Sequence, residues 1–250
     1  MFRPRIIPVL LLKDQALVKS MMFKGFRYIG DPINAVRIFN EMKADELVFL
    51  DIQATKENRL ISLDFVRNVG EEANMPFAVG GGIRTIENIR SIIGAGAEKV
   101  IINSFAAENP DFILKASETF GSSCIVVCID VKKKLFGGMQ TWIYNGSRST
   151  GRSPVDFAKL MEEKGAGEII IQSIEKDGMM NGYDINLIMT ISETVSIPVV
   201  ALGGARNLAD MKIAYNEGFA SGLAAGSMFV YYGNKKAVLI NYPKRSELFN

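Results

Sequence analysis

The chain has 250 residues, 48% of them hydrophobic, which suffices for a large packed core and excludes a largely disordered chain. Its 29 Lys and Arg residues against 27 Asp and Glu residues leave a net charge of +2, which gives no electrostatic case for nucleic acid as the main partner. The sequence contains no His, so imidazole bases and His metal ligands are excluded.

The local sequence predicts a cytoplasmic protein that does not span a membrane. No run reaches the roughly 18 consecutive apolar residues of a transmembrane helix. Residues 1–12 have a basic start and a short apolar run without a small-residue cleavage site, so we interpret them as a first strand and not a signal peptide. Cys124 and Cys128 lie in another apolar run, where we expect packing and not a disulfide or zinc site, as fits a reducing compartment.

Short apolar runs alternate along the chain with amphipathic stretches of helical length. The runs predict strands at residues 5–12, 46–52, 76–79, 99–102, 124–130, 168–174, 198–202 and 222–225. The stretches predict helices at residues 32–43, 62–73, 85–95, 110–120, 154–164, 185–195 and 207–217. Near-continuous apolar strands are typical of parallel sheets covered on both faces, and this number of strands predicts a (β/α)8 barrel. A doubly wound open sheet is the alternative.

An internal repeat supports the barrel. A shift of 122 residues superposes identical residues in three strand–helix units: Pro32 on Pro154, Ala44 on Ala166, Glu46 on Glu168, Pro76 on Pro198, Gly81 on Gly203, Gly82 on Gly204, Arg84 on Arg206 and Gly96 on Gly218. Chance explains some matches, because many strands of this kind end in glycine. The matches at one shift still predict a single domain over residues 1–250, made of half-barrels at about 1–122 and 123–250.

Two strands end in glycine clusters that predict anion sites. Glycines let backbone N–H groups approach an anion, and the N-terminus of the following helix adds a favourable dipole. The first cluster, with the polar residues of the neighbouring strand end, comprises Gly81, Gly82, Asn103 and Ser104; the second comprises Gly203, Gly204, Gly226 and Ser227. Facing each other across the barrel mouth, they predict an elongated ligand with a phosphate or another anion at each end. The alternative is that the glycines only make tight turns.

Six segments carry a resemblance to one family: residues 5–7, 30–32, 45–52, 79–83, 125–130 and 177–184. From about Arg5 to about Phe229 the chain resembles the cyclase subunit of imidazole glycerol phosphate synthase. The resemblance implies a duplicated barrel that docks a glutaminase at its bottom face, where the strands begin. Ammonia would cross the barrel to a substrate with two phosphates at the top face. Aspartates ending the first and fifth strands would act as acid and base, without a metal or cofactor.

One of these aspartates is missing. Asp130 ends the fifth strand, and aligning residues 5–13 with residues 124–132 places Leu11 opposite it. Leucine transfers no proton, whereas general acid–base catalysis is commonly worth roughly 10²–10⁴-fold. Asp14 follows in the loop, where its side chain is expected to point elsewhere. The chain is therefore either a histidine-pathway cyclase that relies on Asp130 and Lys19, or a paralogue that has lost the cyclisation.

We favour the paralogue. Relatives of that kind are associated with bacterial surface polysaccharides such as O-antigen. There they resemble ammonia-delivery subunits that work with a glutaminase and an ATP-dependent sugar amidotransferase to turn an acetamido group into an acetamidino group. Two other classes stay open. The first is a non-catalytic scaffold, which Leu11 favours but which the glycine clusters and Asp130 argue against. The second is a free-standing sugar-phosphate isomerase, which predicts paired catalytic aspartates and is therefore disfavoured by Leu11.

Four charged residues begin strands and match the ring that gates the family's ammonia channel: Arg5, Glu46, Lys99 and Glu168. Two positive and two negative side chains can neutralise one another, as burial requires. The alternative is that they are ordinary solvated residues. The side chains expected to point inward would line an apolar conduit for neutral ammonia: Ile7, Val9, Ile101, Val126, Cys128 and Ile170.

Further candidates follow from their place at the top face, where this fold carries functional groups. Lys19, in the loop after the first strand, is either an anion ligand or a solvated lysine. Asp51, Asp177 and Gly178 end strands or lie in the loops after them. Residues 142–146, Trp-Ile-Tyr-Asn-Gly, predict a hairpin inserted after the fifth strand.

Overall fold

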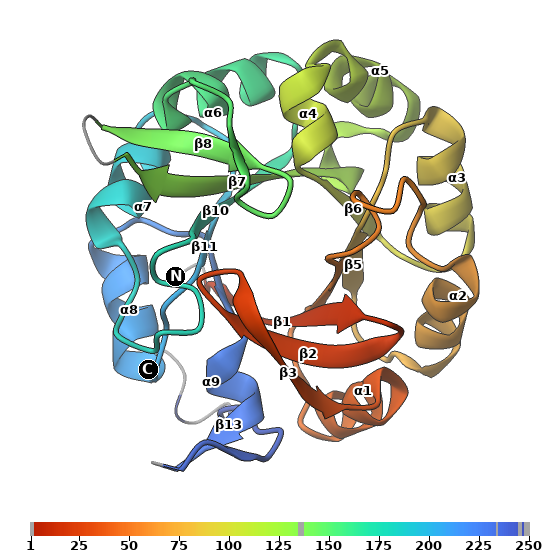
Figure 1. Cartoon of the computed structure of the whole chain (residues 1–250), viewed down its shortest axis with the longest axis vertical. Helices are drawn as coiled ribbons and strands as arrows, with labels where there is room; N and C mark the ends of the chain where they lie inside the picture. The colour runs from red at the N-terminus through yellow and green to blue at the C-terminus, as the bar shows by residue number, and fades with distance from the viewer. Residues whose placement is uncertain (1–2, 135–137, 234, 245–246, 248–250) are drawn as a thin grey trace.

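A computed structural model describes residues 3–134, 138–233, 235–244 and 247 of the chain. Parallel strands form a closed barrel (Figure 1): β1 (Arg5–Lys13), β4 (Leu47–Asp51), β5 (Phe77–Gly80), β6 (Lys99–Ile102), β7 (Ile125–Lys133), β10 (Glu168–Ser173), β11 (Val199–Leu202) and β12 (Gly222–Ala225). Each pairs with its neighbours in this order, and β12 pairs with β1, which closes the ring. The predicted (β/α)8 barrel is confirmed, and the open sheet is wrong.

The predicted helices surround the barrel, with bounds that differ from the expected ones by at most three residues: α1 (Pro32–Glu41), α2 (Leu63–Glu72), α3 (Ile86–Gly94), α5 (Asp111–Phe120), α6 (Pro154–Glu163), α7 (Ile185–Ser192) and α8 (Leu208–Asn216). Side-chain caps explain several starts, because Asp31, Ser62 and Thr85 each accept a hydrogen bond from a backbone N–H in the first turn. Three short helices were not predicted: α4 (Ser104–Glu108), η1 (Ser122–Cys124) and α9 (Ser227–Val230). Within the described part of the chain, no helix has the length and apolarity to cross a membrane.

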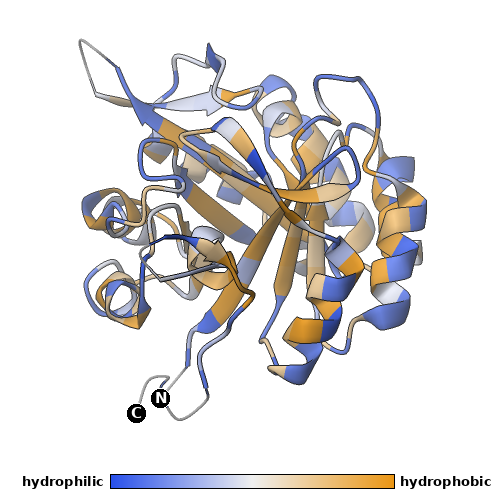
Figure 2. Ribbon diagram, turned by 60° about the horizontal axis from the view of Figure 1, so that its bottom comes forward, coloured by the Kyte–Doolittle hydropathy of each residue, from blue (hydrophilic) through white to orange (hydrophobic). Residues whose placement is uncertain are grey.

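Buried apolar side chains form two separate layers. The larger layer fills the space between strands and helices, and the smaller one lies inside the barrel. Figure 2 shows the strands as a continuous hydrophobic centre within helices that carry hydrophilic outer faces. The inner layer contains all of the side chains that were expected to point inward, Ile7, Val9, Ile101, Val126, Cys128 and Ile170, and Leu11 packs against it. The alternation of side chains along the strands therefore confirms these predicted orientations.

The repeat is visible in three dimensions. Helices α1 and α6, helices α3 and α8, and strands β5 and β11 each begin 122 residues apart. The turns after β5 and β11 also match, because the backbone N–H of Arg84 donates to Asn88 Oδ1 and that of Arg206 donates to Asp210 Oδ2. The two half-barrels are thus built to the same local plan.

Two hairpins extend the first and fifth barrel strands. The predicted one pairs β8 (Met139–Ile143) with β7 and with β9 (Arg148–Ser149); residues 135–137 of this insertion lie outside the described residues. The other, β2 (Ala16–Met21) with β3 (Lys24–Gly30), was not predicted, and Lys19 lies on strand β2, not in a loop. Figure 1 shows β2–β3 and β8 on opposite sides of the barrel. A small hairpin of β13 (Tyr231–Tyr232) and β14 (Ala237–Val238) follows α9.

Candidate active site and the charged ring beneath it

A cavity of about 120 Å³ opens at the carboxyl ends of the barrel strands. Six residues predicted for the top face line it: Asp51, Gly81, Gly82, Asn103, Ser104 and Asp130. They come from β4, β5, β6 and β7 and the segments that follow, which are neighbours in the ring. The fold therefore brings Asp130 of the second half-barrel together with five of the residues predicted in the first.

Asp130 is the buried carboxyl group of this cavity. Asn103 Nδ2 donates a hydrogen bond to Asp130 Oδ2 at 3.1 Å, and the Cys128 thiol donates to Oδ1 at 3.6 Å. Burial raises the pKa of Asp130 to about 7; the negative charge of Asp177 adds to the shift, and the two hydrogen bonds oppose it. A carboxyl group that titrates near neutral pH can either accept or donate a proton under physiological conditions.

Leu11 presents an aliphatic side chain where the first half-barrel would need an acid. It lines the same cavity as Asp130, and its β4 neighbour in the strand register is Leu50, which lines the cavity as well. Asp14 does not replace the missing carboxyl group, because its side chain is 74% exposed and accepts a hydrogen bond from Gln53 Nε2 at 3.1 Å. The first-strand side of the cavity is apolar.

The first glycine cluster packs against the loop after β4. Gly82 has φ +68°, and a Cβ there would collide with the carbonyl oxygen of Arg59. Asp51 stabilises that loop, since its Oδ1 accepts from the backbone N–H groups of Gln53 and Ala54 at 3.0 and 3.1 Å. Its Oδ2 pairs with Arg59 Nη1 at 2.5 Å. The glycine and Asp51 thus have a structural role in the loop, while both still face the cavity.

The second cluster forms a small recess of its own, of about 20 Å³, between β11, β12 and the β2–β3 hairpin. All of the residues predicted for this end line it: Lys19, Asp177, Gly178, Gly203, Gly204, Gly226 and Ser227. The two clusters therefore occupy separate recesses at the top of the barrel. Binding of a ligand with an anion at each end stays a prediction.

Lys19 is buried in this second recess, so the solvated-lysine alternative is wrong. Its Nζ donates to the carbonyl oxygen of Val9 at 2.5 Å and lies against Gly226, where a Cβ would collide with it. Burial lowers the pKa of Lys19 to about 8, and the negative charge of Asp177 opposes that shift. Burial also raises the pKa of Asp177, although Ser20 Oγ donates to this carboxyl group at 2.9 Å. An anion placed in the recess would favour the charged form of Lys19.

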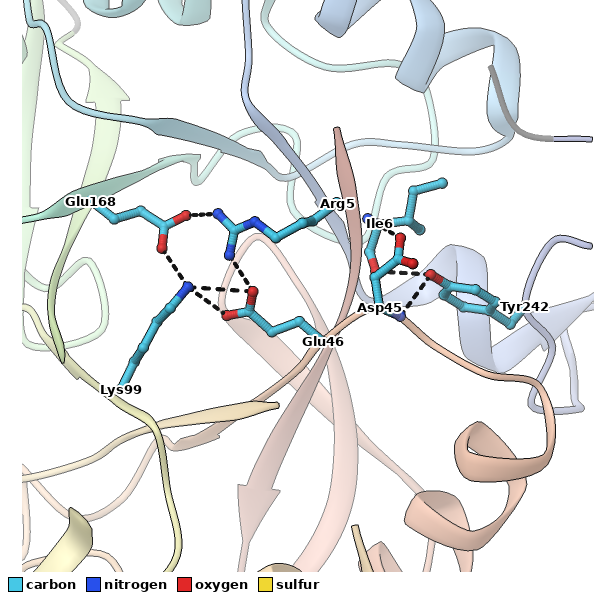
Figure 3. A network of polar contacts seen from close by, with 7 residues as sticks. All are labelled: Arg5, Ile6, Asp45, Glu46, Lys99, Glu168 and Tyr242. Atoms are coloured by element: carbon cyan, nitrogen blue, oxygen red, sulfur yellow. Dashed lines mark hydrogen bonds and ion pairs between the residues drawn. The ribbon is translucent and has the colours of Figure 1, made fainter. Parts of the chain in front are cut away.

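The four predicted ring residues close a continuous set of ion pairs at the bottom of the barrel (Figure 3). Arg5 bonds to both Glu46 and Glu168. Lys99 Nζ lies 3.1 Å from Glu46 Oε1 and 2.9 Å from Glu168 Oε2. Both glutamates are buried, so these are not ordinary solvated side chains. Each charge has two partners of opposite sign, which is the arrangement that makes burial of charge tolerable.

A small apolar void lies directly inside the ring. Glu46 and Glu168 border it from below, and its walls are aliphatic, with Ile7, Val126 and Ile101 among them. Its size allows a single water-sized molecule. Ile101 also lines the large cavity at the top, so its side chain borders both spaces. An apolar lining of this kind favours a neutral molecule over an ion.

Several cavity residues were not found from the sequence. Ser20, Phe23 and Phe26 belong to the unpredicted β2–β3 hairpin, and Gln172 is the β10 neighbour of Asp130 in the strand register. Asn145 sits in the turn of the predicted hairpin, and its Nδ2 donates to the carbonyl oxygen of Ile52 across the cavity mouth at 2.6 Å. For Gln172 a sequence signal existed. It lies two residues after Ile170, which was expected to point into the barrel, so the alternation of side chains along the strand places it on the same inner face as Asp130.

Comparisons with known proteins agree with this geometry. Residues 5–236 match the model of a family described as "Histidine biosynthesis protein". The chain is 44% identical over 248 residues, 99% of both chains, to a Pseudomonas aeruginosa protein with the provisional name imidazole glycerol phosphate synthase subunit hisF2. It is 46% identical over 248 residues, 99% of this chain and 98% of the relative, to a provisionally named subunit HisF of Leptospira borgpetersenii. An imidazole glycerol phosphate synthase subunit HisF from Alkaliphilus metalliredigens is 42% identical over 92% of both chains.

Proposed function

Since this chain belongs to the histidine biosynthesis protein family, as a relative of cyclase-type imidazole glycerol phosphate synthase subunits, we propose that it is the synthase subunit of a cytoplasmic glutamine amidotransferase complex. It receives ammonia from a glutaminase at the bottom of the barrel. It passes the ammonia to an acceptor at the top, for acetamidino-sugar formation in bacterial surface polysaccharide synthesis, together with an ATP-dependent sugar amidotransferase. The observation that carries this proposal is the complete charged ring below an active-site cavity in which Leu11 replaces an acid.

The bottom of the barrel supports the delivery of ammonia. The ring joins Arg5, Glu46, Lys99 and Glu168 at the bottom of the barrel, below the apolar layer of its interior. A molecule that passes the ring enters the aliphatic interior, where neutral ammonia is favoured over ammonium because burying an unpaired charge is costly.

The top of the barrel supports an anionic ligand. Lys19 is buried beside Gly203, Gly204 and Gly226, and it forms no ion pair with the described residues, so a bound anion would supply the opposite charge. A purely structural scaffold has no need of a buried lysine whose pKa is lowered by desolvation. This recess therefore favours a ligand-binding subunit over the non-catalytic scaffold.

Leu11 favours the paralogue over the histidine-pathway cyclase. A cyclase with this cavity would have no carboxyl group at position 11 to share the proton transfers with Asp130, because Leu11 and its β4 neighbour Leu50 present aliphatic side chains there. The specific observation in favour of a cyclase is the pKa of Asp130 of about 7, which suits a group that alternates between acid and base. Both functions use the same ring and conduit, so the reaction at the top distinguishes them.

The deciding experiment supplies the purified chain with ammonium and the bisphosphorylated substrate of the histidine pathway. We expect turnover lower by roughly 10²-fold or more than that of the Alkaliphilus relative, because one acid–base group is absent. Leu11→Asp should raise the rate, and Leu11→Asn, which is polar but not acidic, is the matched control. Turnover by the unaltered chain comparable to that of the relative, with no gain from Leu11→Asp, would contradict the paralogue and support the cyclase.

A further inference from the structure

The wall of the barrel is built differently at the base of its two half-barrels. In the second half, β7 and β10 pair from Val126 and Glu168 upward, and just below them the backbone N–H of Gly167 donates to the carbonyl oxygen of Ile125 at 2.9 Å. This direct hydrogen bond closes the seam between the two strands down to the level of the charged ring.

In the first half, the corresponding seam starts higher. The repeat places Asp45 at the position of Gly167, and the alignment of β1 with β7 places Ile6 at the position of Ile125. Yet the pairing of β1 with β4 begins only at Val9 and Val48. This is two residues further along both strands than in the second half, where pairing begins at Val126 and Glu168. Among the described residues, no backbone–backbone hydrogen bond therefore joins the two strands at their bases.

A tyrosine from the C-terminal segment occupies this gap (Figure 3). The hydroxyl of Tyr242 accepts a hydrogen bond from the backbone N–H of Asp45 and donates one to the carbonyl oxygen of Ile6, each at 3.1 Å. It thus bridges the same two backbone groups that bond directly in the other half. Asp45 reinforces the junction, because its Oδ2 accepts from the backbone N–H of Ile6 at 3.0 Å.

The tyrosine is held firmly in place. Its ring stacks on Phe229, with centroids 5.6 Å apart, and meets the edge of Phe39 at 6.4 Å. The neighbouring Asn241 donates its backbone N–H to the carbonyl oxygen of Phe229 at 2.9 Å. Burial raises the pKa of the Tyr242 phenol, so its hydroxyl keeps the proton that it donates to Ile6.

The bridged residues are the direct neighbours of two ring residues. Arg5 precedes Ile6 and Glu46 follows Asp45, and successive side chains of a strand point to opposite faces. We infer that Tyr242 is a positioning residue, which joins the bases of β1 and β4 from outside the barrel and thereby holds the Arg5–Glu46 side of the ring against Lys99 and Glu168. Its importance for ammonia transfer rests on the proposed function.

The first test uses the full chain alone and measures backbone hydrogen exchange by mass spectrometry. Tyr242→Phe keeps the ring but removes the hydroxyl, so peptides covering residues 3–8 and 44–48 should exchange about fivefold faster or more. Peptides covering residues 125–128 and 166–170 should not change, because their seam is closed by backbone. Tyr232→Phe is the matched control, as its side chain belongs to the same segment and is 65% exposed. Equal exchange in Tyr242→Phe and the unaltered chain would overturn the bridge.

The second test asks whether the ring itself responds. The ¹⁵N NMR signals of the Arg5 guanidinium are assigned by their absence in Arg5→Lys. In the unaltered chain they should show slow rotation of the guanidinium, because two carboxylates hold it. In Tyr242→Phe this slow rotation should be lost. If exchange rises but the Arg5 signals stay unchanged, the bridge exists and the positioning role is overturned. In the complex with its glutaminase, the variant should lose product per glutamine hydrolysed while its rate with excess ammonium stays the same. If the unaltered complex makes no product, the proposed function fails, whereas the exchange and NMR results still decide the role of Tyr242.

Discussion

Asp130 and Leu11 occupy equivalent places in the two half-barrels but differ in what they can do. Asp130 was predicted from its place at the end of the fifth strand, and the structure buries it in the cavity with Asn103 and Cys128 as donors. The leucine at position 11, opposite Asp130, was also visible from the alignment of the halves. The environment of Asp130 was not, because its pKa depends on side chains that the fold brings from other strands.

The burial of Asp130 predicts a pH dependence of stability. Its folded-state pKa of about 7 lies above the ordinary 3.8, so the folded chain retains a proton that the unfolded chain releases between these pH values. The contribution of Asp130 to the free energy of unfolding should therefore fall as pH rises from about 4 to 7 and level off above pH 7, since between these pH values the unfolded state binds fewer protons than the folded state.

Asp130→Asn removes this penalty, because the amide is neutral at every pH. The variant should gain almost no stability near pH 4 and as much as about 4 kcal/mol above pH 7, as measured by urea unfolding at several pH values. Asp14→Asn, at an exposed turn, is the control and should show no comparable gain. A constant difference between Asp130→Asn and the unaltered chain across this range would contradict the buried, raised carboxyl group. Under the proposed function the same variant should also lose acid–base activity, and a gain in stability with a loss of activity would identify a residue kept for function at a cost in stability.

At the scale of elements, the barrel strands and outer helices were predictable because each has a strong local signal. A strand such as β6 is a continuous apolar run, and helices such as α3 begin at a capping residue, Thr85. The β2–β3 hairpin has weaker signals, since its turn contains Met22 and Phe23 at positive φ, not the usual Asn-Gly pair. The cavity residues of that hairpin were missed for the same reason.

The glycine turns combine a conformational and a steric requirement, which substitutions can separate. Gly82 and Gly25 have similar φ values, +68° and +62°, but only at Gly82 would a Cβ collide with backbone, that of Arg59. Gly25→Ala should cost about 1–2 kcal/mol for the left-handed conformation alone. Gly82→Ala should cost roughly 2–5 kcal/mol, because overpacking adds to the same strain. Thermal or urea unfolding measures the difference, and equal losses in both variants would contradict the close approach of the loop after β4.

On the scale of the whole molecule, duplication explains both the resemblances and the differences between the halves. The 122-residue repeat places the two glycine clusters in separate recesses at the top and contributes one glutamate from each half to the ring. The repeat could not predict where the two halves differ, because those differences come from segments of the chain that its matched positions do not include. Tyr242 closes one seam from the C-terminal segment, and Lys19 enters the second recess from a hairpin whose counterpart has no lysine there.

The central claim is that ammonia travels through the barrel from the ring to the top cavity, and isotope tracing tests it most directly. The complex with its glutaminase receives glutamine labelled with ¹⁵N in the side-chain amide, in a buffer containing unlabelled ammonium, and the label in the product is measured by mass spectrometry. We predict that the product keeps the enrichment of the glutamine amide. Lys99→Ala should lower this enrichment by opening one side of the ring, whereas Lys132→Ala, outside the ring, should not. If the ¹⁵N enrichment of the product made by the unaltered complex falls to that of the buffer ammonium, the account is contradicted.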